Sequence, residues 1–143
     1  MQGLLKSGQV GTFRTKWLRV KGHLEYTDIH SDYYKFPQDS LRIAWIPLSK
    51  PTCLKQHSTV PMTASHGPLA LCRGSQLLPD YEYLAPHTEE VPLALPRSSL
   101  PWHSPSLIEE GDFIVFHNRT VHGSLVNRSG ELRLSVDTRW VKG

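Results

Sequence analysis

The chain has 143 residues, of which 38% are hydrophobic and 20% charged, and its formal net charge is +3. These proportions are typical of a globular protein and argue against an intrinsically disordered chain, and no run approaches the roughly 18 apolar residues of a membrane span. Lysine and arginine are scattered without a cluster, so neither a nucleic-acid nor a membrane partner is predicted, whereas a small anionic substrate would suit the charge.

The length predicts a single domain over residues 1–143. The first residues, Met1–Leu5, lack the apolar segment of a signal peptide, and Cys53 and Cys72 do not have the spacing of metal ligands. We therefore expect a cytoplasmic protein with reduced thiols. The sequence does not predict an oligomeric state.

The eleven prolines and ten glycines predict many turns and short strands rather than long helices. In chain order, strands are expected at residues 16–20, 41–48, 67–72, 113–117 and 132–138. No segment has a helical period longer than a turn or two. The sequence therefore predicts a mostly antiparallel β fold, either a barrel or a sandwich.

Two long segments separate these strands and have no sustained period. Residues 49–66 are rich in Ser, Thr, Pro and Lys, and residues 78–106 are rich in proline. A long loop inside a compact domain is usually functional, so we interpret residues 78–106 as an active-site lid and expect them to be the least packed part of the chain. Both loops are expected to determine which primary substrate binds, and their composition does not identify it.

A His-x-Asp pair, His30 and Asp32, lies between the first two predicted strands. On a β-strand, side chains two residues apart point to the same face, so both groups could reach one point above a sheet. They would supply two thirds of the 2-His-1-carboxylate triad that holds Fe(II) on one side. The simpler interpretation of the pair alone is a loop histidine beside a solvated aspartate.

A second group of polar residues lies towards the end of the chain. His122 follows a buried-looking strand and precedes Gly123, and the last strand alternates, with Arg133, Ser135 and Asp137 on one face. A guanidinium and a hydroxyl on one strand face would bind a carboxylate through a bidentate pair and one further hydrogen bond. The simpler interpretation of Arg133 alone is a residue on a solvated strand face, and that of His122 alone is a satisfied interior or loop histidine.

The sequence resembles the phytanoyl-CoA dioxygenase family over about residues 16–141. The resemblance is carried by Thr27–Tyr34, Trp45–Leu48, Gly67–Leu69, Gly74–Ser75 and Gly111–Trp140, most specifically by His122-Gly123-Ser124 and Arg133-Leu134-Ser135. It implies an Fe(II)/2-oxoglutarate-dependent oxygenase on a double-stranded β-helix, a jelly-roll or cupin-like barrel.

Matched by position, the resemblance assigns a role to eight residues. His30, Asp32 and His122 would bind the iron, and Arg133 would pair with the distal carboxylate of 2-oxoglutarate. Residues implied to assist Arg133 or to border the cosubstrate are Ser124, Ser135, Trp45 and Ser31. We expect the ligand atoms of the triad to lie within roughly 4 Å of one another even without metal.

The implied reaction is hydroxylation of a C–H bond of a small organic substrate by O₂, with release of succinate and CO₂. Asp32 favours hydroxylation, because a related halogenating branch has a small residue in place of this carboxylate. The alternative is a catalytically degenerate β-barrel binding module of the same fold. A cupin-like Zn or Mn protein is a third possibility, but it would have no use for Arg133 and Ser135.

The sequence departs from the family pattern in two places. Gln76 stands where members often have a histidine that is not a metal ligand, and only 29 residues precede His30, fewer than in most members. We therefore expect an unpaired sheet edge or an exposed apolar patch, and with it poor solubility or self-association.

Overall fold

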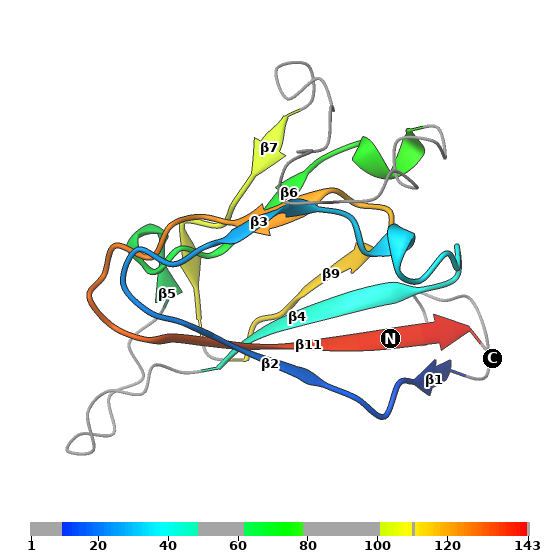
Figure 1. Cartoon of the computed structure of the whole chain (residues 1–143), viewed down its shortest axis with the longest axis horizontal. Helices are drawn as coiled ribbons and strands as arrows, with labels where there is room; N and C mark the ends of the chain where they lie inside the picture. Colours follow the sequence, from blue (N-terminus) through cyan, green and yellow to red (C-terminus); the bar gives the residue numbers. More distant parts are fainter. Residues whose placement is uncertain (1–9, 49–61, 79–100, 110, 143) are drawn as a thin grey trace.

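The computed structural model describes residues 10–48, 62–78, 101–109 and 111–142 (Figure 1). Most of the two predicted loops, residues 49–66 and 78–106, and Cys53 therefore lie outside the described residues. The strands are β1 (Val10–Thr12), β2 (Trp17–Lys21), β3 (Thr27–His30), β4 (Arg42–Leu48), β5 (Met62–Thr63), β6 (Leu69–Cys72), β7 (Trp102–His103), β8 (Leu107–Ile108), β9 (Ile114–His117), β10 (His122–Ser124) and β11 (Arg133–Lys142). Three short 3₁₀ helices accompany them, η1 (Asp32–Tyr34), η2 (Ala64–His66) and η3 (Ser75–Leu77).

The strands form two main antiparallel sheets and one small one. The larger sheet has the order β1-β11-β4-β9, and β2 also pairs with β11. The second sheet has the order β3-β10-β6-β7, and β5 pairs with β8. In Figure 1 the two main sheets lie as separate layers, with β3 and β6 on one side and β4 and β11 on the other. The predicted mostly β, double-stranded β-helix fold is confirmed.

The five predicted strands are present as β2, β4, β6, β9 and β11, and the main difference is the length of the last one. β11 runs to Lys142, past the predicted end at residue 138, because β4 continues to pair with it through Arg42 and β1 pairs with its final residues. Two further strands, β3 and β10, are too short to show a period of their own.

The apolar core lies between the two main sheets. Its buried members come from both layers: Ile43 and Trp45 of β4, Phe116 of β9, and Leu69 of β6, with Ile108 of β8 and Met62 of β5 beside them. A second, smaller cluster consists of Tyr33, Cys72 and Val121. The first cluster forms one wall of the pocket described below.

The inner face of β11 is polar, which reverses the usual pattern of a half-buried strand. Arg133 is 3% exposed and Ser135 0%, and Asp137 and Arg139 are buried with them. The alternate positions of the strand face outwards. Arg133 therefore lies inside the barrel, as predicted, and the interpretation as a solvated strand face is wrong.

Among the described residues, no helix is long and apolar enough to cross a membrane.

Candidate metal and cosubstrate site

His30 and His122 face each other across a pair of antiparallel strands. His30 is the last residue of β3 and His122 the first of β10, and the two are direct partners in the register. Their ring centroids lie 4.3 Å apart. The register shifts between His122 and Ser124, and Gly123 permits this, because a Cβ there would lie 2.9 Å from the carbonyl oxygen of Thr27. The pairing thus brings together two histidines that are 92 positions apart in the sequence (122 − 30).

The side chain of Asp32 lies close to the two imidazoles, but the backbone that carries it is not the predicted strand. β3 ends at His30, and Asp32 is the first residue of η1, not a strand residue. Ser31 makes this change of direction, because its hydroxyl accepts a hydrogen bond from Tyr33 N at 3.1 Å and donates to the carbonyl oxygen of Asn118 at 3.2 Å. The expectation that a strand period places His30 and Asp32 together was therefore wrong, although the two side chains do converge.

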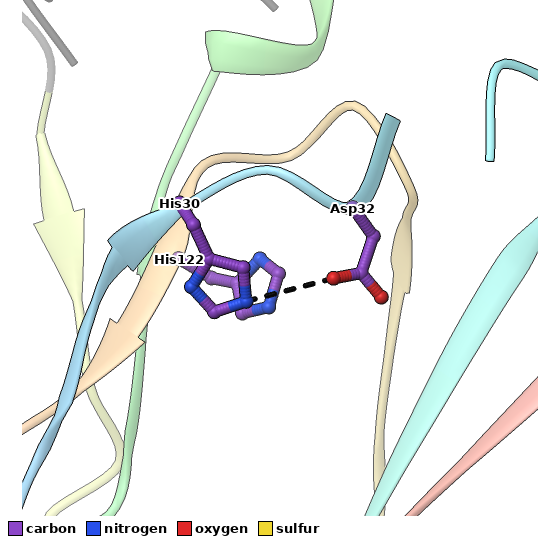
Figure 2. A group of neighbouring side chains, drawn as sticks. All are labelled: His30, Asp32 and His122. Carbon is purple, nitrogen blue, oxygen red and sulfur yellow. Dashed lines mark ion pairs between the residues drawn. The ribbon is translucent and has the colours of Figure 1, made fainter. Parts of the chain in front are cut away.

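The three predicted ligands form one cluster, shown in Figure 2. His30 Nε2 lies 3.5 Å from Asp32 Oδ1, and one ligand atom from each of the three residues lies within 4.8 Å of the others. This spacing is slightly wider than the 4 Å or so that we expected. Among the described residues, these three form the only group of three or more histidine, cysteine or acidic side chains that could hold a metal ion.

The backbone fixes the orientation of both imidazoles. Nδ1 of His30 donates to the carbonyl oxygen of Asp28 at 2.7 Å, and Nδ1 of His122 donates to that of Thr120 at 2.9 Å. A carbonyl oxygen only accepts, so each Nδ1 carries a proton, and Nε2 is the nitrogen that can offer a lone pair to a metal. This arrangement is typical of metal-binding histidines, in which the second ring nitrogen is held by a carbonyl or carboxylate.

The protonation states of the cluster suit a divalent cation. Burial alone would raise the pKa of Asp32, but the hydrogen bond with His30 and the charges of His122 and Arg139 hold it well below its usual range. Burial, together with the nearby His30, lowers the pKa of His122 to about 3. At neutral pH the cluster therefore presents an ionised carboxylate and, at His122, an uncharged imidazole, which are the forms that ligate metals.

Arg133 lies beside the cluster, in a pocket that His30, His122, Trp45 and Ser124 also line. Its Nη1 donates to the carbonyl oxygen of Gly67, and its guanidinium carbon lies 6.0 Å from the centroid of the Trp45 ring. Burial and the neighbouring Arg19 lower the pKa of Arg133 to about 10, so it stays charged at neutral pH.

Four buried side-chain atoms of β11 have no hydrogen-bond partner among the described residues. They are Nε of Arg133, Oγ of Ser135, Oδ1 of Asp137 and Nε of Arg139. An unpaired polar atom in a protein interior is costly, and where one occurs it often marks a place that a ligand or water fills. Nε of Arg133, which lines the pocket, and Oγ of Ser135, two residues along the same strand, are therefore candidates to donate to a bound carboxylate.

The two remaining predicted serines have defined partners in the protein. Oγ of Ser124 accepts from Thr27 N at 2.7 Å, which leaves its own proton available to a ligand in the pocket. Ser31 is buried, and its hydroxyl caps η1 as described above. The structure thus brings Ser124 and Trp45 into the pocket with Arg133, whereas Ser31 supports the segment that carries Asp32.

Sequence reasoning assigned no role in the site to three further residues, although it placed one of them, Asp137, on the face of Arg133. Arg19 Nε lies 2.5 Å from Asp137 Oδ2, and both residues line the pocket. Arg139 Nη2 lies 2.5 Å from Asp32 Oδ2. The period of two along β11 places Asp137 and Arg139 on the face of Arg133, but the predicted strand ended at residue 138, one residue before Arg139. Arg19 showed no comparable signal, because its contact depends on the pairing of β2 with β11.

Several solved structures have a similar fold. The epimerase SnoN, in complex with Fe3+, alpha ketoglutarate and nogalamycin RO, is 25% identical with a TM-score of 0.70, over 99% of this chain and 53% of SnoN. The alpha ketoglutarate dependent carbocyclase SnoK from nogalamycin biosynthesis is 19% identical with a TM-score of 0.76, over 99% and 53% of the two chains. EctD from S. alaskensis, in its apoform, is 19% identical with a TM-score of 0.70, over 99% and 48%.

The chain thus spans about half the length of these solved structures. No curated protein sequence matches it. The model of the family described as Phytanoyl-CoA dioxygenase (PhyH) matches residues 20–135, a range that includes the three clustered ligands and Arg133. The chain therefore belongs to the phytanoyl-CoA dioxygenase family.

Proposed function

We propose that this chain is an Fe(II)/2-oxoglutarate-dependent oxygenase domain that hydroxylates a C–H bond of a small organic substrate, with release of succinate and CO₂. One observation carries the proposal. His30 and His122 of the His30–Asp32–His122 cluster line the same pocket as the buried, charged Arg133, so a metal site and a carboxylate site are neighbours. Membership of the phytanoyl-CoA dioxygenase family supports it, as does the solved complex of SnoN with Fe3+ and alpha ketoglutarate.

The donor set fits Fe(II). Two imidazoles and one carboxylate on one side of a divalent ion form the facial triad of non-haem iron oxygenases, whose other side stays open to ligands. His30, Asp32 and His122 would hold the iron through Nε2 of each ring and Oδ1 of the carboxylate, because Nδ1 of both rings is bound to the backbone. We expect the 4.8 Å spread of the cluster to narrow when a metal binds.

The cosubstrate fits the part of the pocket around Arg133. A carboxylate there would supply the missing partner of Arg133 Nε, and Ser135 Oγ, which also has no partner among the described residues and lies two residues further along β11, is a second candidate donor. Arg133 would supply charge and a planar fork, and Ser124 and Trp45 would fix the remainder of the molecule. Leu69 and Phe116 line the same pocket and would exclude water from it.

Iron and 2-oxoglutarate together supply the coupled oxidation, in which O₂ oxidises both the 2-oxo acid and the substrate C–H bond. The protein residues perform the positioning. The triad keeps one side of the metal open, Arg133 sets the direction of the 2-oxo acid, and the apolar wall limits access of water. Because the chemistry belongs to the bound groups, the identity of the primary substrate depends on pocket residues and on segments outside the described part of the chain.

An anaerobic titration with Fe(II) and then 2-oxoglutarate, followed by visible absorption, tests the proposal. An absorption band should appear only when both are present, and admission of O₂ should then produce succinate. If the band appears but no substrate leads to succinate, the result would support the alternative, a catalytically degenerate binding module of the same fold. A folded protein that binds neither Fe(II) nor 2-oxoglutarate would contradict both.

A further inference from the structure

The two oxygens of the Asp32 carboxylate have different partners. Oδ1 faces His30 Nε2 at 3.5 Å, inside the metal cluster. Oδ2 accepts a hydrogen bond from Arg139 Nη2 at 2.5 Å. Asp32 and Arg139 are both buried, with Arg139 only 2% exposed, so water does not compete for this contact. One oxygen is therefore tied to the protein, and the other is left for a metal.

Arg139 is itself held in place. It lies on the inner face of β11, opposite Ile43 of β4 in the register. Its guanidinium carbon lies 3.5 Å from the centroid of the Trp17 ring and 5.0 Å from that of Phe36. A guanidinium stacked on aromatic rings in a desolvated place gains cation–π energy and loses freedom to rotate.

Phe36 also connects the stack to the segment that carries the aspartate, because its backbone N–H donates to the Asp32 carbonyl oxygen at 3.0 Å. The ring that packs near Arg139 and the carboxylate that Arg139 binds therefore belong to one short turn after β3. Three separate elements, β2, β11 and this turn, thus meet at Arg139 and fix the position of Asp32.

We propose that Arg139 is a positioning residue for the metal site: by binding Oδ2 it makes Asp32 a ligand through Oδ1 alone. The proposal rests on the proposed function. If both carboxylate oxygens were to turn towards the metal, a charged, buried hydrogen bond would break and Arg139 would be left without its counter-ion, which is strongly unfavourable. Single-oxygen binding keeps one more position free on the open side of the metal.

The sign of one measurement separates positioning from a simple charge effect. A positive charge next to the site repels a metal cation, so if charge were the only role of Arg139, its removal would strengthen metal binding. If Arg139 positions Asp32, its removal weakens binding, since loss of a residue that orients a metal ligand typically reduces affinity by about 10–100-fold.

The test compares Arg139→Gln and Arg139→Lys with wild type, using Co(II) as an air-stable substitute for Fe(II). We expect Arg139→Gln to bind Co(II) about 10–100-fold more weakly and to change the visible d–d spectrum of the bound ion. Arg139→Lys keeps the charge but not the planar stack on Trp17, so its Co(II) affinity should lie between those of wild type and Arg139→Gln. Near-UV circular dichroism of the metal-free proteins establishes that each variant is folded.

Arg119→Gln is the matched control. Arg119 also lies over an aromatic ring, 4.7 Å from the centroid of Tyr33, and also pairs with an aspartate, Asp39, at 3.3 Å. Asp39 is not a member of the metal cluster. Loss of this arginine should therefore leave the Co(II) affinity and spectrum as in wild type, although it also removes an aromatic contact and an ion pair, the latter with an exposed aspartate.

Unchanged or tighter Co(II) binding with an unchanged spectrum in Arg139→Gln would overturn the proposal. If that variant does not fold, the same result in Arg139→Lys would overturn it. A wild-type protein that binds no Co(II) would refute the proposed function itself. If wild type binds Co(II) and 2-oxoglutarate and the two Arg139 variants match it, the proposed function survives and only the role of Arg139 is lost.

Discussion

The inner and outer faces of β11 have opposite characters, whereas the neighbouring β4 keeps apolar side chains on its inner face. The inner face of β11 carries buried polar and charged groups, and its outer face carries the half-buried Leu134 and Val136 beside exposed apolar residues of β2. The outer side chains form two rows across β2, β11 and β4 in direct register, namely Val20–Leu134–Leu48 and Leu18–Val136–Ile46. Leu18 is 61% exposed and Val20 49%.

The difference between the two faces shows where the fold includes buried groups that lower its stability. Burying Arg133, Ser135, Asp137 and Arg139 costs desolvation energy, which a core of apolar residues would not incur. Such a face is expected where a charged ligand and a metal must be held. The outer face includes the exposed Leu18, Val20 and Leu48, as expected for an exposed apolar patch.

The largest effect is expected when Asp32, the buried partner of Arg139, is removed. Asp32→Ala deletes a metal ligand and leaves Arg139 buried without its counter-ion. We expect loss of measurable metal binding and a decrease of about 3–5 kcal/mol in the free energy of unfolding. Calorimetric titration with Co(II) and urea denaturation measure the two quantities. Wild-type metal affinity in this variant would remove Asp32 from the site.

Arg133→Leu should separate cosubstrate binding from metal binding. We expect 2-oxoglutarate affinity to fall by about 2–4 kcal/mol, because a desolvated carboxylate loses its charged partner, while Co(II) affinity stays nearly unchanged. Arg133→Lys should restore only part of the 2-oxoglutarate affinity, since an ammonium cannot reproduce the planar fork of a guanidinium. Equal 2-oxoglutarate affinity in wild type and Arg133→Leu would show that the carboxylate binds elsewhere.

Ser135→Ala gives a smaller and more selective effect. Its hydroxyl is fully buried and has no partner among the described residues, so removing it should not lower the free energy of unfolding. If the hydroxyl donates to a bound carboxylate, 2-oxoglutarate affinity should fall by about 0.5–1.5 kcal/mol. Denaturation and calorimetry on the same samples test both parts; a loss of stability without a loss of affinity would indicate a structural hydroxyl.

The smallest effect on the site is expected from the outer face. In the double variant Leu18→Thr and Val20→Thr, β-branched side chains keep the strand preference while the apolar rows are interrupted. Stability should stay within about 1 kcal/mol, and Co(II) and 2-oxoglutarate affinities should not change. Sedimentation velocity over a range of concentrations should show less self-association than for wild type. Identical self-association in both proteins would show that these rows are not responsible.

The parts of the site that were predicted from the sequence are those with a local pattern. The period of two placed Arg133, Ser135 and Asp137 on one face, and the family resemblance identified His30, Asp32 and His122. The direct pairing of His30 with His122 was not predictable, because it depends on a register shift at Gly123 in two short strands. Arg139 was missed because the pairing of β11 with β4 and β1, and not its own pattern, extends that strand.

Gly67 has a consequence for how this site can change during evolution. Its φ is 65°, and a Cβ at this position would meet the carbonyl oxygen of Leu125 and lie 2.7 Å from Asn127 N, so every other residue type is strained and obstructed here. Its carbonyl oxygen also receives the hydrogen bond of Arg133. A side chain at position 67 would therefore have two costs, one for the fold and one for the position of Arg133, because displacement of this carbonyl would remove the hydrogen bond that holds the guanidinium.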